Sequence, residues 1–562
     1  MKSETKVCQN CKCEFTIEPD DFQFYEKIKV PPPTWCPECR LQRRLAFRNE
    51  RSLYKRKCDL CRDDIIAVYS PDKPFTVYCP TCYYSDKWDS LAYGRDYDFS
   101  RPFFAQWRDL QLKVPRLSLF QQNVVNSPWV NYELDDKNCY LNVGGHKNED
   151  SAYNQYVLRG KDCFDNYWTM DSQFAYESIL SEKCYKIFYS TFCFDCRDTY
   201  FSFDCRDCSN IFGCTGLRHR QYHIFNEPVS KEKFQAFISE NTSGSRAKLT
   251  AISEQAYKFW RSKPQRAVFI DQKSVNSRGN FLKESKNCRE CVMAEKTEDS
   301  RYIFLTLQVK DSYDATSVWG AEQLYEVWGG SEQLSRIHFS MGVPRQGSDI
   351  EYSEFLLNCH NCFGCISLRN KNHVILNKQY TKNEYEILMV KILKHMAATP
   401  YLDKRERVYK YGEFFPPELS PYGYNETVAN EYFPLDKKQV FEKGLNWNEY
   451  ESETAYAFSD YAIPDDVKDV NDGILEKVLK SEASGKPYRI IPMELTFYRR
   501  FNLPIPRLTP FERHQKRLLF IAKHRKVQNR ECGNCGRSIP SVYTKEEFPV
   551  VYCESCYNSE VV

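Results

Sequence analysis

The sequence predicts a mainly β protein with small α parts, and three observations lead to this prediction. Short runs rich in Tyr, Phe, Val and Ile recur through residues 131–400, and such runs are typical of β-strands. Paired C-x-x-C spacings occur near both ends of the chain. The stretch "CDLCRDDIIAVYSPDKPFTVYCPTCYYS" (residues 58–85) is closely matched by "CGNCGRSIPSVYTKEEFPVVYCESCYNS" (residues 532–559). We therefore expect duplicated cysteine modules at both ends of a stacked β-repeat centre.

Length and composition set the outer bounds. A chain of 562 residues is long enough for three or four domains, and its net charge of +3 selects no class of partner. The start, "MKSETKVCQN", lacks the apolar core of a secretory signal, and no apolar run approaches the length of a membrane span. We therefore expect a cytoplasmic protein with no membrane partner.

Twelve of the 26 cysteines form six C-x-x-C turns, here called knuckles, which are arranged in three pairs near the chain ends. Two C-x-x-C turns brought together give the tetrahedral thiolate shell that Zn²⁺ prefers. Four thiolates close that shell, so these sites are expected to be structural, with three zinc ions per chain. Redox or disulfide pairs are the alternative, and the absence of a thioredoxin-like context disfavours them. The predicted ligand groups are Cys8, Cys11, Cys36 and Cys39; Cys58, Cys61, Cys79 and Cys82; and Cys532, Cys535, Cys553 and Cys556.

The duplication extends upstream of the second module. A shift of 473 residues aligns "FYEKIKVPPP" with "FYRRFNLPIP" and "RLQRRL" with "RHQKRL". It also places Ser481, Ser484, Thr509 and Glu512 opposite the four cysteines of the first group. We therefore expect a pair of ribbons at each end, with the third of the four ribbons free of metal.

A basic stretch separates the two ribbons of each pair. Residues 40–57 hold eight Lys or Arg against one Glu, and residues 499–530 hold ten against one. Leucines in both stretches suggest an amphipathic helix with its charged side in solvent, where clustered cations can bind phosphates. A solvated helix face, or pairing with the acidic stretch 449–476, is the alternative. The candidate nucleic-acid contacts are Arg40, Arg43, Arg44, Arg48, Arg513, Lys516 and Arg517.

The centre repeats with a different period. Its aromatic markers are spaced 9 to 13 residues apart in one series and 11 to 12 in the next, which favours stacking of like units as a β-solenoid or a meander. The two series close alike in "FGCTGLRHRQYHIFN" and "FGCISLRNKNHVILN", and a helical segment follows each. Thirteen cysteines lie here, and Ala or Ser replaces them at equivalent points. We therefore favour packing over further metal binding for them.

These features give an expected order of modules along the chain. It runs as ribbon 1 with a basic helix (1–57), ribbon 2 (58–90), an aromatic-rich linker or helix (91–130), β-repeat unit 1 with a helix (131–262), β-repeat unit 2 with a helix (263–400), a Pro/Tyr-rich and acidic connection (401–480), a metal-free ribbon with a basic helix (481–531) and ribbon 3 (532–562).

The first module resembles a known domain. "CQNCKCEFTIEPDDFQFYEKIKVPPPTWCPECRLQRR" is similar to the probable zinc-ribbon domain of many bacterial open reading frames, with Cys8, Cys11, Cys36 and Cys39 as the matching ligands. The stretches "DKWDSLAYGRDYDFSRPFFAQW", "KNCYLNV" and "LTFYRRFNLPIPR" resemble a family of uncharacterised cysteine-rich zinc-ribbon proteins from bacteria. The resemblance implies zinc ligands and no particular activity.

Two functions fit these features. The first is a zinc-binding, non-enzymatic protein that binds RNA, DNA or ribonucleoprotein through its basic ribbon modules. The second is a protein-interaction scaffold whose β-repeat centre is the platform and whose ribbons are caps, since terminal repeats otherwise expose apolar faces. P-loop, dinucleotide-binding and H-E-x-x-H motifs are missing from the sequence, so we expect no enzyme and no small-molecule substrate.

Overall fold

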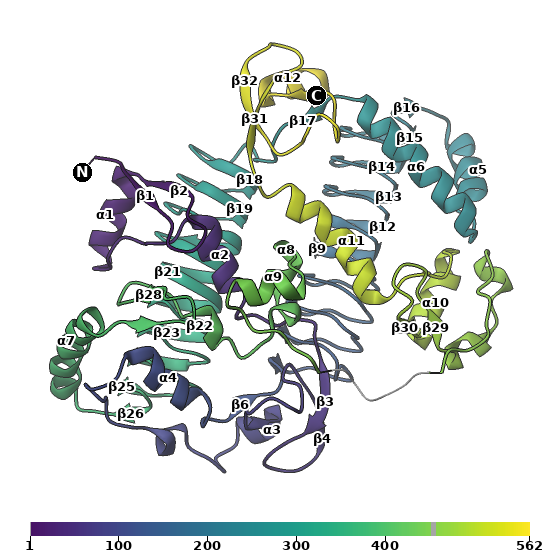
Figure 1. The fold of residues 1–562 in the computed structure, drawn as a ribbon. Helices are drawn as coiled ribbons and strands as arrows, with labels where there is room; N and C mark the ends of the chain where they lie inside the picture. Colours follow the sequence, from purple (N-terminus) through teal and green to yellow (C-terminus); the bar gives the residue numbers. More distant parts are fainter. Residues whose placement is uncertain (1, 451–456, 562) are drawn as a thin grey trace. The chain divides into compact units, whose positions relative to one another are not determined.

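The computed structural model describes residues 2–450 and 457–561 (Figure 1). Strands make up 31% of the chain and helices 25%, so the class is mixed, with strand in excess, rather than mainly β. The chain forms two compact units, each built from two segments. Unit 1 consists of Met1–Ser118 and Phe269–Tyr450, and unit 2 consists of Leu119–Val268 and Glu451–Val562. Each unit thus joins one end of the chain to one half of the centre, an arrangement that the linear order of modules does not reveal.

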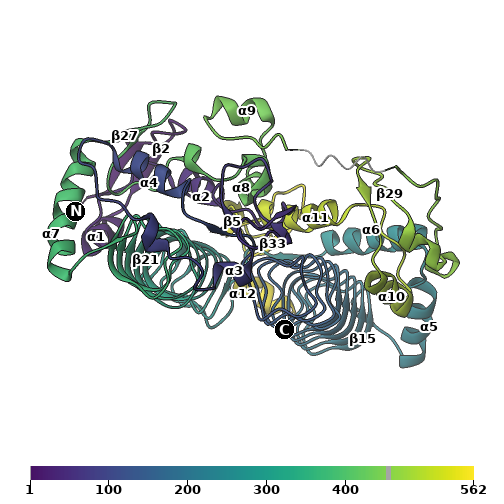
Figure 2. The ribbon, with the colours of Figure 1, turned by 90° about the horizontal axis from the view of Figure 1, so that it is seen from below.

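In both units the central segment winds in turns of about twelve residues. In unit 2, parallel bridges join Tyr140 to Ala152, Ala152 to Phe164 and Phe164 to Tyr176. In unit 1, Lys286 pairs with Glu298 and Glu298 with Lys310 in the same way. Figure 2 looks nearly along the direction in which the turns are stacked, so that each stack appears as superimposed loops. We call residues 270–379 the coil of unit 1 and residues 121–228 the coil of unit 2.

A three-residue repeat shapes these turns. In unit 2 almost every third residue has a positive φ, as at Tyr153 (63°) and Tyr156 (55°), and the residue that follows points inward. A left-handed conformation costs a non-glycine residue about 1–2 kcal/mol. Hydrogen bonds between turns offset this cost: the backbone N–H of Asn154 donates to the Asn142 side chain (3.1 Å), and that of Asn166 to the Asn154 side chain (3.0 Å).

Small inward residues are a consequence of this geometry, because each turn is narrow. The interior of the unit 1 coil is a cluster of Cys, Ala, Val, Ile and Leu, and that of unit 2 is rich in cysteine. All thirteen central cysteines directly follow a residue of positive φ and are buried. Their C-x-x-C spacing is therefore the three-residue repeat of the coil.

Unit 1 holds a nine-stranded sheet that is parallel except for the final hairpin, β25–β26. This sheet consists of β18 to β26. The strands of unit 1 as a whole are β1 (Glu4–Val7), β2 (Glu14–Ile17), β3 (Tyr54–Lys57), β4 (Asp64–Ala67), β5 (Val77–Tyr78), β6 (Arg116–Leu117), β18 (Arg278–Lys283), β19 (Arg289–Glu295), β20 (Phe304–Lys310), β21 (Tyr313–His338), β22 (Met341–Val343), β23 (Arg345–Glu351), β24 (Leu357–Phe363), β25 (Asn372–Ile375), β26 (Lys378–Gln379), β27 (Tyr401–Leu402) and β28 (Val408–Tyr409). Its helices are α1 (Pro19–Lys27), α2 (Pro37–Leu45), α3 (Pro80–Tyr83), α4 (Phe103–Gln111), α7 (Lys382–Ala398), α8 (Val428–Tyr432) and α9 (Lys437–Glu442).

Unit 2 holds a six-stranded sheet that likewise ends in an antiparallel hairpin, β15–β16. This sheet consists of β10 and β12 to β16. The strands of unit 2 as a whole are β7 (Gln121–Gln122), β8 (Glu133–Leu134), β9 (Tyr167–Met170), β10 (Gln173–Tyr176), β11 (Ile179–Glu182), β12 (Tyr185–Phe188), β13 (Arg197–Tyr200), β14 (Ser209–Phe212), β15 (Gln221–Ile224), β16 (Glu227–Pro228), β17 (Gln265–Arg266), β29 (Leu479–Lys480), β30 (Pro487–Tyr488), β31 (Gln528–Glu531), β32 (Ser538–Ser541) and β33 (Val551–Tyr552). Its helices are α5 (Lys231–Asn241), α6 (Arg246–Ser262), α10 (Pro492–Phe501), α11 (Pro510–Lys523) and α12 (Glu554–Val561).

Candidate metal centres

The first cysteine group lies between a hairpin and a helix start. The β1–β2 hairpin presents Cys8 and Cys11, and Cys36 is the N-cap of α2. Lys12, just after the second cysteine, has a φ of 65°, and its N–H bonds to the Cys8 carbonyl (3.0 Å). This tight turn directs the sulfurs of Cys8 and Cys11 toward one point. Together with the sulfurs of Cys36 and Cys39 they form a group of four Sγ atoms that lie within 4.8 Å of one another.

The second and third groups repeat this geometry. Arg62 (φ 69°) and Gly536 (φ 70°) take the place of Lys12, each after the second cysteine of its knuckle. A backbone N–H at the start of the second knuckle donates to the first sulfur of the ribbon, from Cys79 to Cys58 and from Cys553 to Cys532, at 3.3 Å in both. All three sites are therefore built to one plan.

The sulfur spacing fits a tetrahedral ion. A Zn–S bond of about 2.3 Å implies about 3.8 Å between sulfurs. The structure gives 3.8 Å between Cys11 and Cys36 and 4.0 Å between Cys61 and Cys79. The three groups could therefore each hold a metal ion, as the sequence predicts.

Neighbouring groups favour the thiolate at two of the four cysteines of the third site. The Arg537 guanidinium donates to Cys535 Sγ (3.3 Å), and this contact lowers the pKa of the Cys535 thiol. A hydrogen bond with the Ser555 hydroxyl lowers the pKa of Cys553 to about 6. Since metal binding requires deprotonated cysteine, both contacts assist it.

The metal-free ribbon keeps the plan with different chemistry. Gly485 has a φ of 71°, and its N–H bonds to the Ser481 carbonyl (3.0 Å), as in the metal knuckles. The Glu512 carboxylate accepts hydrogen bonds from the Ser481 hydroxyl (2.6 Å) and the Thr509 N–H (2.8 Å). Burial by itself raises the pKa of Glu512. Hydrogen bonds from Ser481, Ser484 and Thr509 outweigh this effect and lower the pKa to about 2. A carboxylate, capping α11 with Thr509, thus ties the two knuckles together in place of metal.

The arginines of the basic helix of unit 1, α2, do not face solvent. Arg40 and Arg44 on α2 both contact Asp314 of the coil, at 2.9 and 3.0 Å, and Arg44 also contacts Glu326 (3.3 Å). Arg43 lies between Glu326 (2.6 Å) and Glu413 (3.0 Å). These side chains are at most 1% exposed, which corrects the expectation of a charged side in solvent.

Unit 2 repeats the arrangement on α11. Arg513 contacts Glu494 (2.8 Å) and Asp165 (3.4 Å), and Arg517 contacts Asp165 (2.9 Å) and Glu177 (3.1 Å). With Arg48, which pairs with Glu50, six of the seven expected phosphate contacts are buried and bound to carboxylates. Only Lys516 of the seven is exposed.

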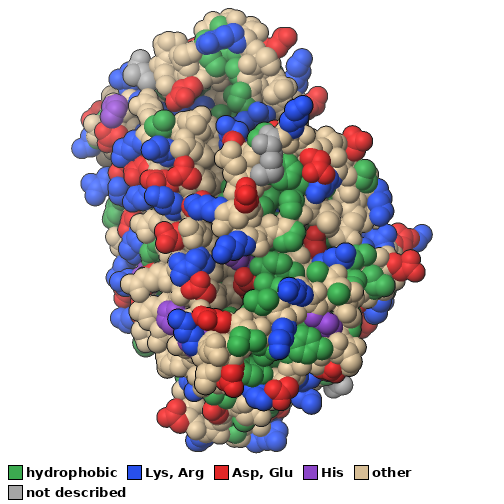
Figure 3. Space-filling view, turned by 90° about the vertical axis from the view of Figure 1, so that its left-hand side faces the viewer, with side chains coloured by type: hydrophobic (Ala, Val, Ile, Leu, Met, Phe, Trp, Pro, Cys, Tyr) green, Lys and Arg blue, Asp and Glu red, His purple; other side chains and the backbone are tan. Residues whose placement is uncertain are grey.

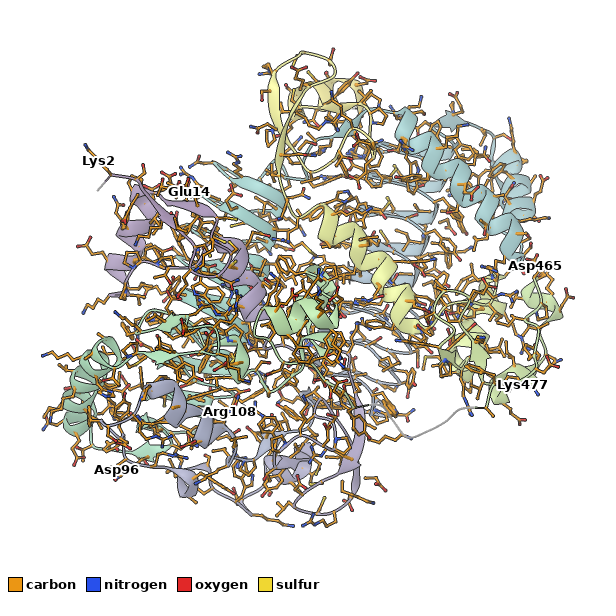
Figure 4. The ribbon with its side chains drawn as sticks, in the orientation of Figure 1. Lys2, Glu14, Asp96, Arg108, Asp465 and Lys477 are labelled. Atoms are coloured by element: carbon orange, nitrogen blue, oxygen red, sulfur yellow. The ribbon has the colours of Figure 1, made fainter. Side chains whose placement is uncertain are left out.

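Among the described residues, the acidic stretch supplies none of the partners of these six arginines, although its Asp472 pairs with Arg499 of the second basic stretch (2.6 Å). Asp465, labelled in Figure 4, instead accepts a hydrogen bond from the Ala247 N–H (3.1 Å) in the first turn of α6. Four of the partners come from the coils, namely Asp165, Glu177, Asp314 and Glu326, and sequence reasoning missed them. A signal was present: Asp165 and Glu177 each follow an aromatic marker and lie twelve residues apart, as do Asp314 and Glu326.

The central cysteines have their own partners. The Cys196 thiol donates to the Phe194 carbonyl (3.2 Å) and lies 3.5 Å from the Cys205 carbonyl, and Cys184 makes the same pair of contacts at 3.3 Å with Glu182 and Cys193. Inward serines such as Ser172 donate to the carbonyl two residues earlier in the same way. The central cysteines therefore take the place of serines within the coil.

A search with family models gave no match, and a search of curated proteins gave no similar sequence. Among the described residues, every helix is too short or too polar to cross a bilayer.

Proposed function

We propose that this protein is a zinc-binding, non-enzymatic scaffold in which the coils bind partner proteins and the ribbons brace the coils. One observation carries the proposal. The arginines that could have bound phosphates are instead used to fix each ribbon pair to the coil of its own unit. The ribbon modules are therefore structural elements of the coil.

The brace has a simple geometric basis. Two arginines four residues apart on a helix lie on one face, one turn of about 5.4 Å apart. Residues twelve apart in a coil lie on neighbouring strands, about 4.8 Å apart. Arg40 and Arg44 therefore match the spacing of Asp314 and Glu326, and the same match recurs in unit 2.

Aromatic contacts follow the same register. Phe24 of α1 stacks on Tyr313 with ring centroids 3.9 Å apart, and the aligned Phe497 packs on Phe164 at 4.3 Å. Each unit thus contains the same kind of internal interface, made of aromatic rings and buried ion pairs. Its repetition supports a structural role for the duplicated modules.

Zinc supplies the folding free energy of the three small ribbons. Hairpins of this size bury little apolar surface, and a closed four-thiolate shell stabilises such a module when metal binds. The same closed shell leaves no position for a reacting water, which supports a structural role over a catalytic one.

The outer faces of the coils carry charges of both signs. In unit 2, Glu149 lies between Lys137 (3.3 Å) and Lys161 (3.2 Å) on successive turns. In unit 1, Arg336 pairs with Asp349 at 2.6 Å. On the face drawn in Figure 3, Lys and Arg side chains are interspersed with Asp and Glu. Such a mixed surface suits a protein partner better than a polyanion.

The test compares two kinds of partner. Anisotropy titrations with generic RNA and DNA at two salt concentrations should show no saturable, salt-dependent binding. Cross-linking of the tagged chain in native extract should map a protein partner onto the outer coil lysines.

The variant K137E/K161E should lose that partner, and K248E, an exposed change on α6, should retain it. Steeply salt-dependent binding of RNA or DNA would overturn the scaffold proposal. Equal capture of the partner by both variants would remove the coil face from it.

A further inference from the structure

A cavity of about 190 Å³ lies in unit 2, against the outer face of the coil. Tyr189 and Phe201 of the coil form one wall, and residues 500–504 at the end of α10 form another. The connection between α5 and α6 closes it with Thr242 and Ser243. The Ser243 hydroxyl is buried and has no hydrogen-bond partner among the described residues.

Unit 1 contains the equivalent walls. Its stacked pair Phe339 and Tyr352 (centroids 4.7 Å apart, planes at 18°) corresponds to Tyr189 and Phe201 (4.8 Å, 11°). The 473-residue shift aligns residues 27–31 with residues 500–504. Both segments hold a left-handed residue at the same point, Lys29 with φ 58° and Asn502 with φ 53°. The two places are therefore copies of one site.

In unit 1 a tyrosine and a glycine fill this place. The Tyr411 ring lies 6.2 Å from the ring centroids of both Phe339 and Tyr352. The Gly412 N–H donates to the Tyr352 hydroxyl (2.9 Å). Gly412 has a φ of 98°, and a Cβ there would come within 2.9 Å of Pro31. A residue other than glycine would fit poorly.

In unit 2 the same volume holds no side chain of the described residues. A cavity of about 150 Å³ lined by apolar side chains is large enough to bind benzene. A cavity of about 190 Å³ can therefore receive a phenol ring. Phe201 lacks the hydroxyl that Tyr352 offers, but the unpaired Ser243 hydroxyl supplies a polar contact on the facing wall. Lys186 and Arg500 at the cavity favour a neighbouring acidic residue.

We propose that this cavity binds a tyrosine–glycine segment of a partner polypeptide, in the manner in which unit 1 holds its own Tyr411 and Gly412. The inference adds a partner chemistry to the proposed scaffold function and rests on it. It does not use Lys137 or Lys161, the lysines that test the scaffold proposal, so the two proposals can fail separately.

The probe is a synthetic acetyl-Lys-Tyr-Gly-Glu-amide peptide, which copies residues 410–413, titrated calorimetrically into the full zinc-loaded chain. We expect saturable binding with one site per chain. A peptide with Ala in place of Tyr should bind at least tenfold more weakly, because it leaves the ring position empty. S243F should weaken binding at least tenfold by filling the cavity from the α5–α6 connection.

L249W fills the same cavity from α6 and should have the same effect, so a folding defect in one variant does not decide the test. K248E is the matched control and should bind like the wild type. Absence of binding to the wild type, or binding unchanged in both filled variants, would overturn the proposal. Binding of p-cresol as tight as that of the peptide would assign the cavity to small phenols instead and overturn the polypeptide assignment. In either case the cross-linking test of the coil face would stand.

Discussion

Replacement of Asp165 by Asn tests whether buried ion pairs fix the ribbon modules to the coils. The Asp165 carboxylate is fully buried and contacts both Arg513 and Arg517, which are at most 5% exposed. Asn keeps the shape and an acceptor oxygen but removes the charge. The change takes one carboxylate partner from each arginine, while Arg513 keeps Glu494 and Arg517 keeps Glu177. Loss of hydrogen bonds to a charged group costs about 1.5–3 kcal/mol.

For a unit of this size each kcal/mol shifts Tm by roughly 2–4 °C, so D165N should lower the Tm of unit 2 by roughly 3–12 °C. Hydrogen exchange measured by mass spectrometry resolves the two units by peptide. We expect the loss of protection in α11 and in strands β9 to β14. The corresponding variant D314N should instead affect α2 and the coil of unit 1.

D198N is the matched surface control, because Asp198 forms a half-exposed pair with Lys186 at 3.2 Å. Such pairs contribute at most about 1 kcal/mol. The double variant D165N/R517M removes both members of the Asp165–Arg517 pair and should lose less stability than the sum of the single changes. A destabilisation below about 1 kcal/mol in D165N would refute the reasoning.

Elemental analysis should find three zinc ions per chain in the wild type and two in C79S. C196S should keep three, because the Cys196 thiol lies inside the coil, and loss of zinc in C196S would contradict the packing role of the central cysteines. Exchanging all four ligand-equivalent residues of the metal-free ribbon for cysteine should raise the count to four, and a count still at three would show that its backbone differs from that of the metal knuckles. Because the pKa of Glu512 falls from 4.5 to about 2 on folding, its stabilisation is present above about pH 4.5 and is lost as the pH falls toward 2. Denaturant unfolding of the wild type at pH 5 and pH 3 should reveal this loss, and E512Q should be less stable at pH 5 and show a smaller change; an identical pH dependence in both proteins would rule out this role for Glu512.

Local chemistry was open to prediction from the sequence. Ligand sets such as Cys58, Cys61, Cys79 and Cys82 follow from spacing, because a C-x-x-C turn is closed by hydrogen bonds within a few residues. The substitution of Ser481 and Glu512 for cysteines predicted a ribbon without a four-cysteine site, and a hydrogen bond between these two side chains joins its two halves. Burial of the central cysteines also agrees with the packing interpretation. Each of these features depends on neighbours along the chain.

The fate of the basic helices could not be predicted in this way. Arg40 and Arg513 look alike in sequence whether they face solvent or a carboxylate, and their partner Asp314 or Asp165 lies hundreds of residues away. The sequence by itself determined the three cysteine ligand sets and the duplication of the chain ends, since short-range spacing and turn chemistry encode them. Only the tertiary structure decided that the N-terminal cysteine modules pack on the coil of unit 1, residues 270–379, and the C-terminal modules on the coil of unit 2, residues 121–228. That choice depends on aromatic and charged groups meeting across distant segments, where burial turns a solvent-facing cation into half of an ion pair.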